Sequence, residues 1–386
     1  MGRVYDLAII GGGLAGASTA YFACRRGAHT VLLERADVNL GASGSNAGSI
    51  HAQIPFDPFQ ALGRDWARRY AETIPLFMAS IARWRALEDE LDGSLGLSLK
   101  GGLMVARTPA DMAALRDKSE IERAAGLYVT NLEGQALHDH LPGLAPDMLG
   151  GAFCPIEGKA DPFRVAPLFV RRAIEAGLTL LRGHKVHAIA KKGGVFTLSA
   201  GSETIQAHRV VNAAGADAAR VSAMVGVRVP IEAHAIQVAV TERCPPVLPY
   251  LLYYTGEKLT LKQSAEGSFL IGGGWPARMG GPGKDYPMVD TTSMVRNLAV
   301  ASAVLPALSG VRIVRSWAAF VNGTPDWRPV LGETPAVPGF FLNLFPWMGF
   351  TAAPAISEAI ADLALGGTPS IDLSAFALES PGLRTL

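Results

Sequence analysis

Cysteine is scarce in this sequence, and its placement excludes several kinds of site. The three cysteines, Cys24, Cys154 and Cys244, lie far apart, and none has a partner at the short spacing of a metal or redox motif. We therefore expect small core or surface residues rather than disulfide partners or metal ligands. Free thiols of this kind are typical of a reducing compartment.

Long uninterrupted apolar runs are also missing, although 49% of the residues are hydrophobic. The most apolar stretch towards the C-terminus, residues 340–365, is interrupted by two prolines and two acidic residues, Pro346, Pro354, Glu358 and Asp362. The first six residues lack the basic region and apolar core of a secretory signal peptide. The sequence therefore predicts a cytoplasmic protein without a transmembrane segment.

Neither sign of charge predominates. The chain has 35 basic and 34 acidic residues, and its formal net charge is +1. We therefore expect neither nucleic acid nor a charged membrane as a partner. The length of 386 residues exceeds what one hydrophobic core usually serves, so two domains are expected. The 43 glycines suit an α/β protein with many tight turns.

The N-terminal residues carry the clearest motif. Residues 4–10 are almost all apolar and predict a strand, which leads into the glycine-rich residues 11–16 and then a helix ending near Gly27. A second strand follows over residues 30–33 and is closed by Glu34. This order of strand, glycine-rich turn, helix, strand and terminal acid is the dinucleotide-binding fingerprint in its required context.

Each part of this motif has a physical role. Gly11 permits the tight turn, Gly13 lets the backbone approach a pyrophosphate, and Gly16 lets the helix lie close to the strand. The pyrophosphate would bind unpaired N–H groups at the helix N-terminus. Glu34 would accept hydrogen bonds from ribose hydroxyls, and because its charge opposes a 2′-phosphate, NADP is disfavoured.

The rest of the chain alternates between helical and strand patterns. Residues 41–51 are small and polar, which suits either a surface loop or a thin backbone beside a planar cofactor. Apolar residues from 59 to 91 recur at helical spacing, and Pro75 predicts a break there. Further helices are expected over residues 111–125, 164–176, 292–305 and 353–365. Strands are expected within residues 98–107, 178–215, 231–241, 251–261, 269–274, 311–319 and 340–344.

These patterns predict an α/β fold with a Rossmann-like dinucleotide domain that is interrupted in sequence, and a second α+β domain built on an antiparallel sheet. We assign residues 1–92, 146–226 and 321–386 to the first domain. Residues 93–145 and 227–320 are assigned to the second.

The ordered motifs resemble those of the FAD-dependent oxidoreductases of the D-amino-acid oxidase, glycine oxidase and sarcosine oxidase type. The resemblance covers nearly the whole chain and is closest to the FAD-bearing beta subunits of bacterial opine, hydroxyproline or proline dehydrogenases. Besides the first motif, it rests on residues 42–48, 161–162, 186, 210–215, 270–274, 323–332 and 349–354.

The resemblance implies FAD as the cofactor and a set of residues that bind it. The pyrophosphate would lie against Gly11, Gly13, Leu14, Ala15 and Gly16, with Glu34 and Arg35 at the adenosine end. The remaining FAD contacts would come from Ala42, Ser43, Ser45, Asn46, Ala47, Gly48, Val186, Ala214, Gly215, Gly323, Asp326, Gly349, Phe350 and Thr351. Backbone N–H groups of the last three would lie near the flavin N1 and C2 carbonyl, where a helix N-terminus stabilises the charge of reduced flavin.

The resemblance further implies hydride transfer from the carbon that bears the nitrogen, with no obligatory acid–base residue and no metal. Three candidates for the catalytic site remain. His51 follows the small-residue stretch, although a lone histidine is as often structural. Lys262 matches a position where relatives have a basic residue near the cofactor, although an exposed strand lysine is an equally simple explanation. Met348, with Trp347, precedes the glycine that faces the flavin and suits either a pocket wall or the core.

One departure from the family pattern bears on the substrate. Amino-acid oxidases of this type have an arginine before the Gly-Thr pair, where it binds the substrate carboxylate through two parallel hydrogen bonds. Here Val321 or Asn322 occupies that place. Either His51, Lys262 or Arg328 holds the carboxylate instead, or the substrate is different.

The sequence thus favours an FAD-dependent dehydrogenase of a secondary amine or imino acid, such as an opine, hydroxyproline or proline. We expect it to be the catalytic subunit of a hetero-oligomer that passes electrons to an acceptor or partner subunit. One alternative is a stand-alone oxidase of glycine, sarcosine or a D-amino acid. A second is a non-catalytic subunit whose FAD only relays electrons. An enzyme that uses NAD alone is disfavoured, because residues 349–354 would then have no role.

Overall fold

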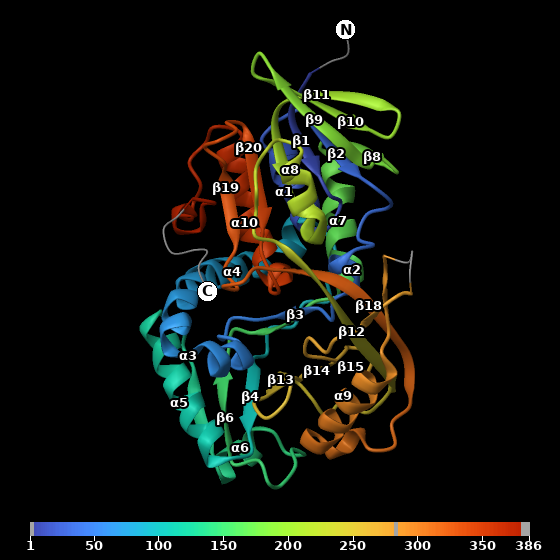
Figure 1. Ribbon diagram of the computed structural model, residues 1–386. Coiled ribbons are helices and arrows are strands. Elements are labelled where there is room, and N and C mark those ends of the chain that lie inside the picture. The colour runs from blue at the N-terminus through green and yellow to red at the C-terminus, as the bar shows by residue number, and fades with distance from the viewer. Residues whose placement is uncertain (1–3, 282–284, 380–386) are drawn as a thin grey trace.

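The computed structural model of the chain describes residues 4–281 and 285–379. Two regions, each built on its own sheet, lie one above the other in Figure 1. The long strands β12 (Glu232–Arg243) and β18 (Ile313–Gly323) belong to the lower sheet and extend to the upper region, where β18 contacts α2 (Ala42–Ser45) and both contact η2 (Gly215–Asp217).

The upper region contains a mostly parallel sheet. In spatial order its main strands are β19 (Val330–Glu333), β20 (Phe340–Leu344), β11 (Glu203–Asn212), β1 (Tyr5–Ile10), β2 (Thr30–Glu34) and β8 (Thr179–Arg182). β9 (Val186–Lys192) and β10 (Val195–Ala200) add an antiparallel meander through β11. The central strands are apolar on both faces, as expected of a parallel sheet that is covered on both sides.

Helices cover both faces of this sheet. α1 (Leu14–Arg25) packs between α7 (Pro162–Glu175) and α10 (Gly349–Ala364), and α10 also contacts α4 (Ile74–Glu90). The side chains of Leu7 and Ile9 point to this helical layer. Those of Ala8 and Ile10 face the opposite side, where α8 (Ala218–Ala223) lies. Alternate side chains of β1 thus belong to two separate hydrophobic cores.

The lower region contains the second large sheet. Its order is β18, β12, β15 (Ser268–Gly272), β14 (Thr260–Gln263), β13 (Leu251–Tyr254), β4 (Gly102–Ala106), β6 (Gly150–Cys154) and β5 (Thr130–Glu133). Adjacent strands run antiparallel except β13 and β4, which are parallel. The α/β class with a second, mainly antiparallel domain is therefore confirmed.

The lower sheet is also covered on both faces. Met104, Ala106 and Tyr253 belong to the same core as α3 (Phe56–Tyr70), α4 and α5 (Pro109–Ala124). Leu103, Val105 and the neighbouring strands pack against α9 (Thr291–Val304) and α6 (Gln135–His140). Short elements complete the fold: β3 (Ser49–Ile50), η1 (Ala71–Thr73), β7 (Gly158–Lys159), β16 (Arg278–Met279), β17 (Pro287–Met288), η3 (Pro306–Leu308) and η4 (Ser374–Phe376).

Several expected elements differ in detail. The helical stretch expected from residue 59 to 91 is interrupted before Pro75 rather than at it: Gly63 has a non-helical φ of +77° within α3, and η1 separates α3 from α4, whose first turn contains Pro75. The strand expected over residues 251–261 is instead the two antiparallel strands β13 and β14. Within residues 98–107 only β4 is a named strand, and residues 41–51 form α2 and β3 rather than a plain loop. The last long helix begins at Gly349 rather than near residue 353.

One strand bears on the assigned domain boundaries. β6 falls within residues 146–226, which the sequence assigns to the dinucleotide domain, yet it pairs with β4 and β5 of the lower sheet. The five-segment division of the chain stays a prediction. No helix within the described ranges has the length and apolar character needed to cross a membrane.

Candidate active site

The glycine-rich turn after β1 leaves no room for side chains. Gly11 has a φ of +109°, and a Cβ there would lie 2.5 Å from the carbonyl oxygen of Ala213. A Cβ on Gly16 would lie 1.9 Å from the carbonyl oxygen of Gly11. Both positions therefore require glycine, because β1, α1 and the end of β11 approach one another directly.

Two side chains bind the backbone at this turn. Glu34, at the end of β2, accepts hydrogen bonds from the N–H groups of Gly12 (2.7 Å) and Ala36 (2.8 Å). The Ser43 hydroxyl accepts one from the N–H of Leu14 (2.8 Å). The structure thus brings the small-residue stretch onto the N-terminus of α1, as a shared cofactor site requires. Gly13 is the N-cap of α1 and provides no side-chain cap.

Other residues predicted to contact the adenosine half of FAD lie near the carboxyl ends of strands in the same sheet. Gly215 follows the carboxyl end of β11 and begins η2. Arg35, just beyond β2, forms a long ion pair of 3.8 Å with Asp217 of η2. The carbonyl oxygen of Val186 in β9 accepts a hydrogen bond from Arg220 (3.2 Å). In open α/β sheets, ligands bind outside the carboxyl ends of the strands.

A second helix N-terminus lies at the other end of the site. α10 begins at Gly349, and its N-cap Met348 provides no side-chain cap. The first turn is held from two sides, because the carbonyl oxygen of Thr351 accepts from Ser80 Oγ (2.7 Å) and Trp84 Nε1 (2.9 Å) of α4. Thr351 Oγ1 accepts from the backbone N–H of His51 (2.8 Å), so the segment after β3 is attached to the same turn.

These features fit FAD. Two long helices have N-cap residues, Gly13 and Met348, that provide no side-chain cap, and each helix N-terminus attracts negative charge. One lies beside the crowded glycines and Glu34, which suit a pyrophosphate and ribose. The other lies beside the small-residue segment, which suits a flat ring that carries negative charge when reduced.

A cavity of about 290 Å³ lies between the two regions. Its walls come from the small-residue segment, the first turn of α3, the lower sheet and the start of α10. Much of the wall is aromatic: Phe56, Tyr253, Tyr254, Trp317, Phe320, Trp327, Trp347 and Phe350. Trp327 and Trp347 stack with ring centroids 4.7 Å apart. Trp317 Nε1 donates to the carbonyl oxygen of Ser45 (2.7 Å), which joins β18 to α2.

No arginine is found among the described residues that line this cavity. Val321, at the place where the family pattern expects the carboxylate-binding arginine, lines the wall. The charged residues of the lining are Asp57 and Lys258. Burial raises the pKa of Asp57, and the charge of Lys258 opposes that shift. Lys258 is therefore the cation that the cavity offers to an anionic group.

His51 lines the cavity as the small-residue stretch predicts, but in a form without charge. Its Nδ1 lies 2.7 Å from the hydroxyl of Tyr253. Burial and then the charge of Lys262 lower the pKa of His51 to about 3. A neutral imidazole cannot pair with a carboxylate as an ion, so in this form His51 would offer no ion pair to a substrate carboxylate.

The other two suggested replacements are buried and are not among the residues that line the cavity, although Lys262 contacts the lining residue Ser49. Lys262 is 1% exposed, and its ammonium donates to Ser49 Oγ. Burial and the charge of Lys159 lower the pKa of Lys262 to about 7. Arg328 is 5% exposed and forms an ion pair with Glu72 at 2.5 Å. Neither Lys262 nor Arg328 lines the cavity.

Of the remaining sequence candidates, Met348 lines the cavity, and its sulfur accepts a hydrogen bond from Tyr70 (3.2 Å). Gly323 and Asp326 are not part of the lining. A Cβ on Gly323 would lie 2.7 Å from the ring of His234. The backbone carbonyl of Asp326 accepts from Trp66 Nε1 (2.9 Å), and Asp326 Oδ1 accepts from the N–H of Arg328 (3.1 Å).

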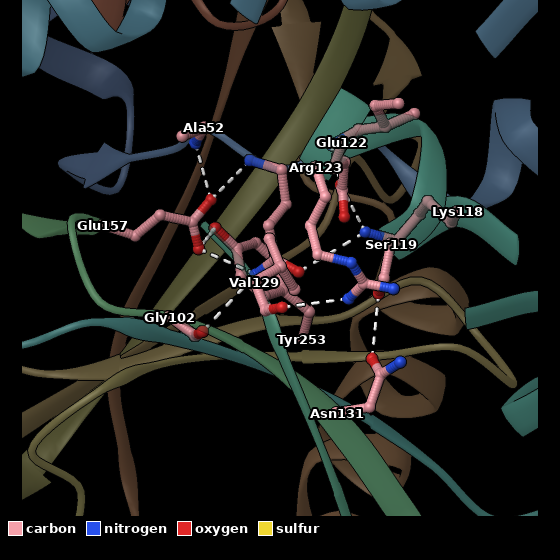
Figure 2. Close-up of polar contacts among 12 residues, drawn as sticks. Ala52, Gly102, Lys118, Ser119, Glu122, Arg123, Val129, Asn131, Glu157 and Tyr253 are labelled. Carbon is pink, nitrogen blue, oxygen red and sulfur yellow. Dashed lines mark hydrogen bonds and ion pairs between the residues drawn. The ribbon is translucent and has the colours of Figure 1, made fainter. Parts of the chain in front are cut away.

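The residues that follow His51 in sequence are bound to a buried polar network that sequence reasoning missed, and Figure 2 shows this network around Glu157 and Glu122. Glu157 accepts from the N–H groups of Ala52 (2.5 Å) and Gln53 (2.7 Å), from Gln53 Nε2 (3.0 Å) and from the Tyr253 hydroxyl (3.1 Å). Glu122 accepts from the N–H of Ile54 (2.7 Å) and pairs with Lys118 at 2.5 Å. Glu157, Lys118 and Glu122 are all 0% exposed.

This network fixes the three residues that follow His51, because two buried carboxylates bind three successive backbone N–H groups. Glu157 follows β6 and Glu122 lies on α5, far from residue 51 in sequence. No local pattern marks either residue, and Tyr253 resembles any strand tyrosine. Only their burial and mutual contacts identify them.

Three comparisons place this geometry among known proteins. A sequence profile of the family described as FAD dependent oxidoreductase matches residues 6–363. An opine oxidase subunit of Agrobacterium tumefaciens is 29% identical, over 96% of each chain. The beta subunit of sarcosine oxidase from Rhizobium meliloti is 26% identical, over 97% of this chain and 88% of the relative. The crystal structure of glycine oxidase from Geobacillus kaustophilus superposes with a TM-score of 0.85 and 25% identity, over 98% of this chain and 99% of the other.

Proposed function

Because the chain belongs to the family of FAD-dependent oxidoreductases that oxidise amines and amino acids, we propose that it is a dehydrogenase of a secondary amine or imino acid. The substrate class includes opines and cyclic imino acids such as proline and hydroxyproline. The chain would be the catalytic, FAD-bearing subunit of a hetero-oligomer. One observation carries the proposal: the cavity beside the α10 N-terminus has an aromatic wall, a neutral histidine and no arginine.

The chain's own residues would hold the cofactor at both ends. Gly11, Gly13 and the N-terminus of α1 would bind the pyrophosphate, and Glu34 the ribose. Gly349 to Thr351 would place the N-terminus of α10 beside the ring. When bound, FAD supplies an acceptor for a hydride from the carbon that bears the substrate nitrogen. The protein's task is then to orient a neutral amine and exclude water.

The cavity lining supports a substituted amine rather than glycine. Packing against the aromatic wall favours apolar substituents on the amine, because each buried apolar group contributes to binding. A carboxylate would have to pair with Lys258 instead of an arginine held in the family position. One mobile ammonium binds a carboxylate less specifically than a planar guanidinium does.

The subunit role rests on the relatives. Two that match over most of the chain are named as subunits, of opine oxidase and of sarcosine oxidase. Among the described residues no group of histidine, cysteine and acidic side chains could hold a metal ion. If electrons leave the flavin through a metal centre, that centre would have to be on a partner chain. Otherwise the electrons would pass to a soluble acceptor.

An anaerobic absorbance titration tests the proposal. The purified, FAD-loaded chain is mixed in turn with opines, proline, hydroxyproline, sarcosine, glycine and D-alanine, and the oxidised flavin band is followed. We expect bleaching by a secondary amine, with slow recovery in air and fast recovery with an artificial acceptor. Fast recovery in air after glycine or a D-amino acid would favour a stand-alone oxidase. A flavin that none of these amines reduces would contradict the catalytic role.

A charge-neutral variant refines the substrate class. Lys258→Met should raise the concentration needed for half reduction about tenfold for an amine with a carboxylate, because a charge-assisted hydrogen bond is lost. Amines without a carboxylate should be unaffected. Lys100→Met, at an exposed lysine outside the lining, is the control. An equal effect of both variants would exclude Lys258 as the carboxylate partner.

A further inference from the structure

Three side chains from separate parts of the chain form a line that ends at the cavity. Glu157 follows β6, Tyr253 lies on β13 and His51 follows β3. Glu157 Oε2 accepts from the Tyr253 hydroxyl (3.1 Å), and the Tyr253 oxygen lies 2.7 Å from His51 Nδ1. His51 and Tyr253 line the cavity, whereas Glu157 is fully buried behind them. Within the described residues, Nδ1 is the only ring nitrogen of His51 with a hydrogen-bond partner.

Counting the donors fixes the direction of this line. Glu157 Oε1 receives two backbone N–H groups, and Oε2 receives the Gln53 amide and the Tyr253 hydroxyl. Three of these four partners are N–H groups, which cannot accept a hydrogen bond from a protonated carboxyl, so this arrangement favours an ionised, acceptor-only carboxylate. The single hydroxyl proton of Tyr253 is then used on Glu157. The Tyr253 oxygen can only accept from His51, which requires the ring proton to be on Nδ1.

We propose that Glu157 and Tyr253 are positioning residues that hold His51 as the tautomer with its proton on Nδ1, so that the unprotonated Nε2 accepts a hydrogen bond from the N–H of the substrate amine. This inference rests on the proposed function, because it takes the cavity ligand to be an amine. The neutral histidine then has a defined role. Its unprotonated Nε2 can accept a hydrogen bond from an N–H group, but it has no proton to donate to a carboxylate.

The charges around His51 agree with this role. Lys262 of β14 disfavours the imidazolium form, and burial acts in the same direction, so the pKa of His51 is lowered to about 3. Burial raises the pKa of the Glu157 carboxyl, and the hydrogen bonds from the Gln53 and Ala52 backbone oppose this shift only in part, so the ionised form rests on the donors around its two oxygens. Burial and then the charge of Glu157 raise the pKa of Tyr253, which therefore stays a hydroxyl. His51 is thus neutral and has a single ring proton. The hydrogen bonds from His51 through Tyr253 to Glu157 determine which ring nitrogen carries it.

The tautomer can be read directly from the ring nitrogens. The FAD-loaded chain is labelled with ¹⁵N at its eight histidines, and the resonances of His51 are identified by their loss in His51→Gln. Protonated and unprotonated ring nitrogens differ widely in chemical shift. We expect a protonated Nδ1 and an unprotonated Nε2 in the wild-type protein at neutral pH.

Glu157→Gln should reverse the tautomer. The two backbone N–H groups at Oε1 require the amide oxygen there, so the amide NH2 group must take the place of Oε2 and donate to Tyr253. The Tyr253 hydroxyl then donates to Nδ1, and the ring proton moves to Nε2. Tyr253→Phe keeps the Glu157 carboxylate and its hydrogen bonds to the backbone of residues 52 and 53. It removes the hydroxyl between Glu157 and His51, so His51 should become a mixture of tautomers.

Tyr254→Phe is the matched control, because Tyr254 is the next residue on β13 and also lines the cavity, but has no hydrogen bond to His51. It should leave the tautomer as in the wild type. A wild-type His51 with its proton on Nε2, or an unchanged tautomer in Tyr253→Phe, would overturn the proposal. Because Tyr253→Phe does not disturb the buried carboxylate, this test holds even if Glu157→Gln fails to fold.

Affinity for the amine gives the second readout. In the anaerobic titration, Glu157→Gln should need about tenfold more amine for half reduction, because an acceptor facing the substrate becomes a donor. Tyr128→Phe, at an exposed tyrosine outside the cavity lining, is the control for affinity and should match the wild type. If no amine reduces the flavin but the tautomer follows the expected pattern, the proposed function fails while the line from Glu157 to His51 stands. A reversed tautomer without any loss of affinity would overturn the role of Nε2 in binding.

Discussion

Lys262 is a single buried residue whose charged form lowers the stability of the fold. It is one of the largest fully buried side chains, and its ammonium has Ser49 as its hydrogen-bond partner. Burial disfavours the charged form, and so does the charge of Lys159 nearby. The sequence alone allows an ordinary exposed strand lysine here. The structure instead shows a buried group whose pKa is lowered from 10.5 to about 7.

This shift predicts a pH-dependent effect of Lys262→Met. Between about pH 7 and 10.5 the unfolded chain binds the Lys262 proton and the folded chain does not, so the wild-type free energy of unfolding rises with pH. The variant has no ammonium to bury, so it lacks the destabilisation that the wild type has at the lower end of this range. It should therefore be more stable than the wild type, by an amount on the order of a few kcal/mol at pH 7 and less towards pH 10. Denaturant unfolding of both proteins, saturated with FAD, measures the difference.

Lys185→Met is the control for this prediction, since Lys185 is exposed. Its stability relative to the wild type should not change with pH between 7 and 10. A difference between Lys262→Met and the wild type that stays constant over this range would show that Lys262 is charged in the folded protein.

At the scale of elements, the packing of α1 on β1 decides whether the cofactor site forms. α1 carries alanine at positions 17, 20 and 23, and all three are fully buried. Its first turn passes so close to β1 that the backbone of Gly11 occupies the space of a side chain at residue 16. The helix N-terminus is thus held where a pyrophosphate would bind.

We expect Gly16→Ala to disturb this contact. The new methyl group would lie 1.9 Å from the carbonyl oxygen of Gly11, so α1 must move away from β1. The variant should lose about 1–3 kcal/mol of stability, the usual cost of overpacking, and retain less FAD after purification. Absorbance at the flavin band per mole of protein measures the retention.

Gly41→Ala is the matched control, because it lies at the N-cap of α2 in the same site. A Cβ there meets nothing within 4 Å, and its φ of −83° suits alanine. It should retain FAD like the wild type. Full FAD retention by Gly16→Ala would contradict the position assigned to the pyrophosphate.

At the scale of the whole molecule, the two regions in Figure 1 both contribute walls to the cavity, beside which the proposed FAD site lies. The cavity takes its walls from the small-residue segment and α10 on one side and from β12, β13 and β18 on the other. The segment after His51 is held by Glu157 and Glu122 of the lower region. A ligand that binds across these parts should therefore stabilise the folded chain as a unit.

Thermal unfolding should distinguish the two halves of the cofactor. FAD at about 1,000 times its dissociation constant adds about 4 kcal/mol to the stability of the folded state. FMN at the same concentration should give a clearly smaller rise in melting temperature, because it lacks the adenosine half assigned to Glu34 and the turn after β1. Equal rises for FAD and FMN would contradict that assignment.

The sequence by itself determined the parts that depend on local geometry. A strand, a turn that only glycine can make and a helix are specified by neighbouring residues, so residues 4–34 and the α/β class followed from spacing and periodicity. The helix N-terminus at 349 and the missing arginine at Val321 were also visible, because both belong to ordered motifs. Even so, periodicity alone started this helix near residue 353 and did not show the turn between β13 and β14, since weak local patterns do not fix element ends.

The tertiary structure alone decided the environment of each candidate residue. His51 is neutral because burial, and then the charge of Lys262 on β14, lowers its pKa, and Lys262 is uncharged for much of the alkaline range because strands bury it. Glu157 approaches residue 53 across 104 positions of sequence. Burial and long-range contact set the pKa, the tautomer and the cavity wall, and these depend on how the sheets pack rather than on any neighbouring residue.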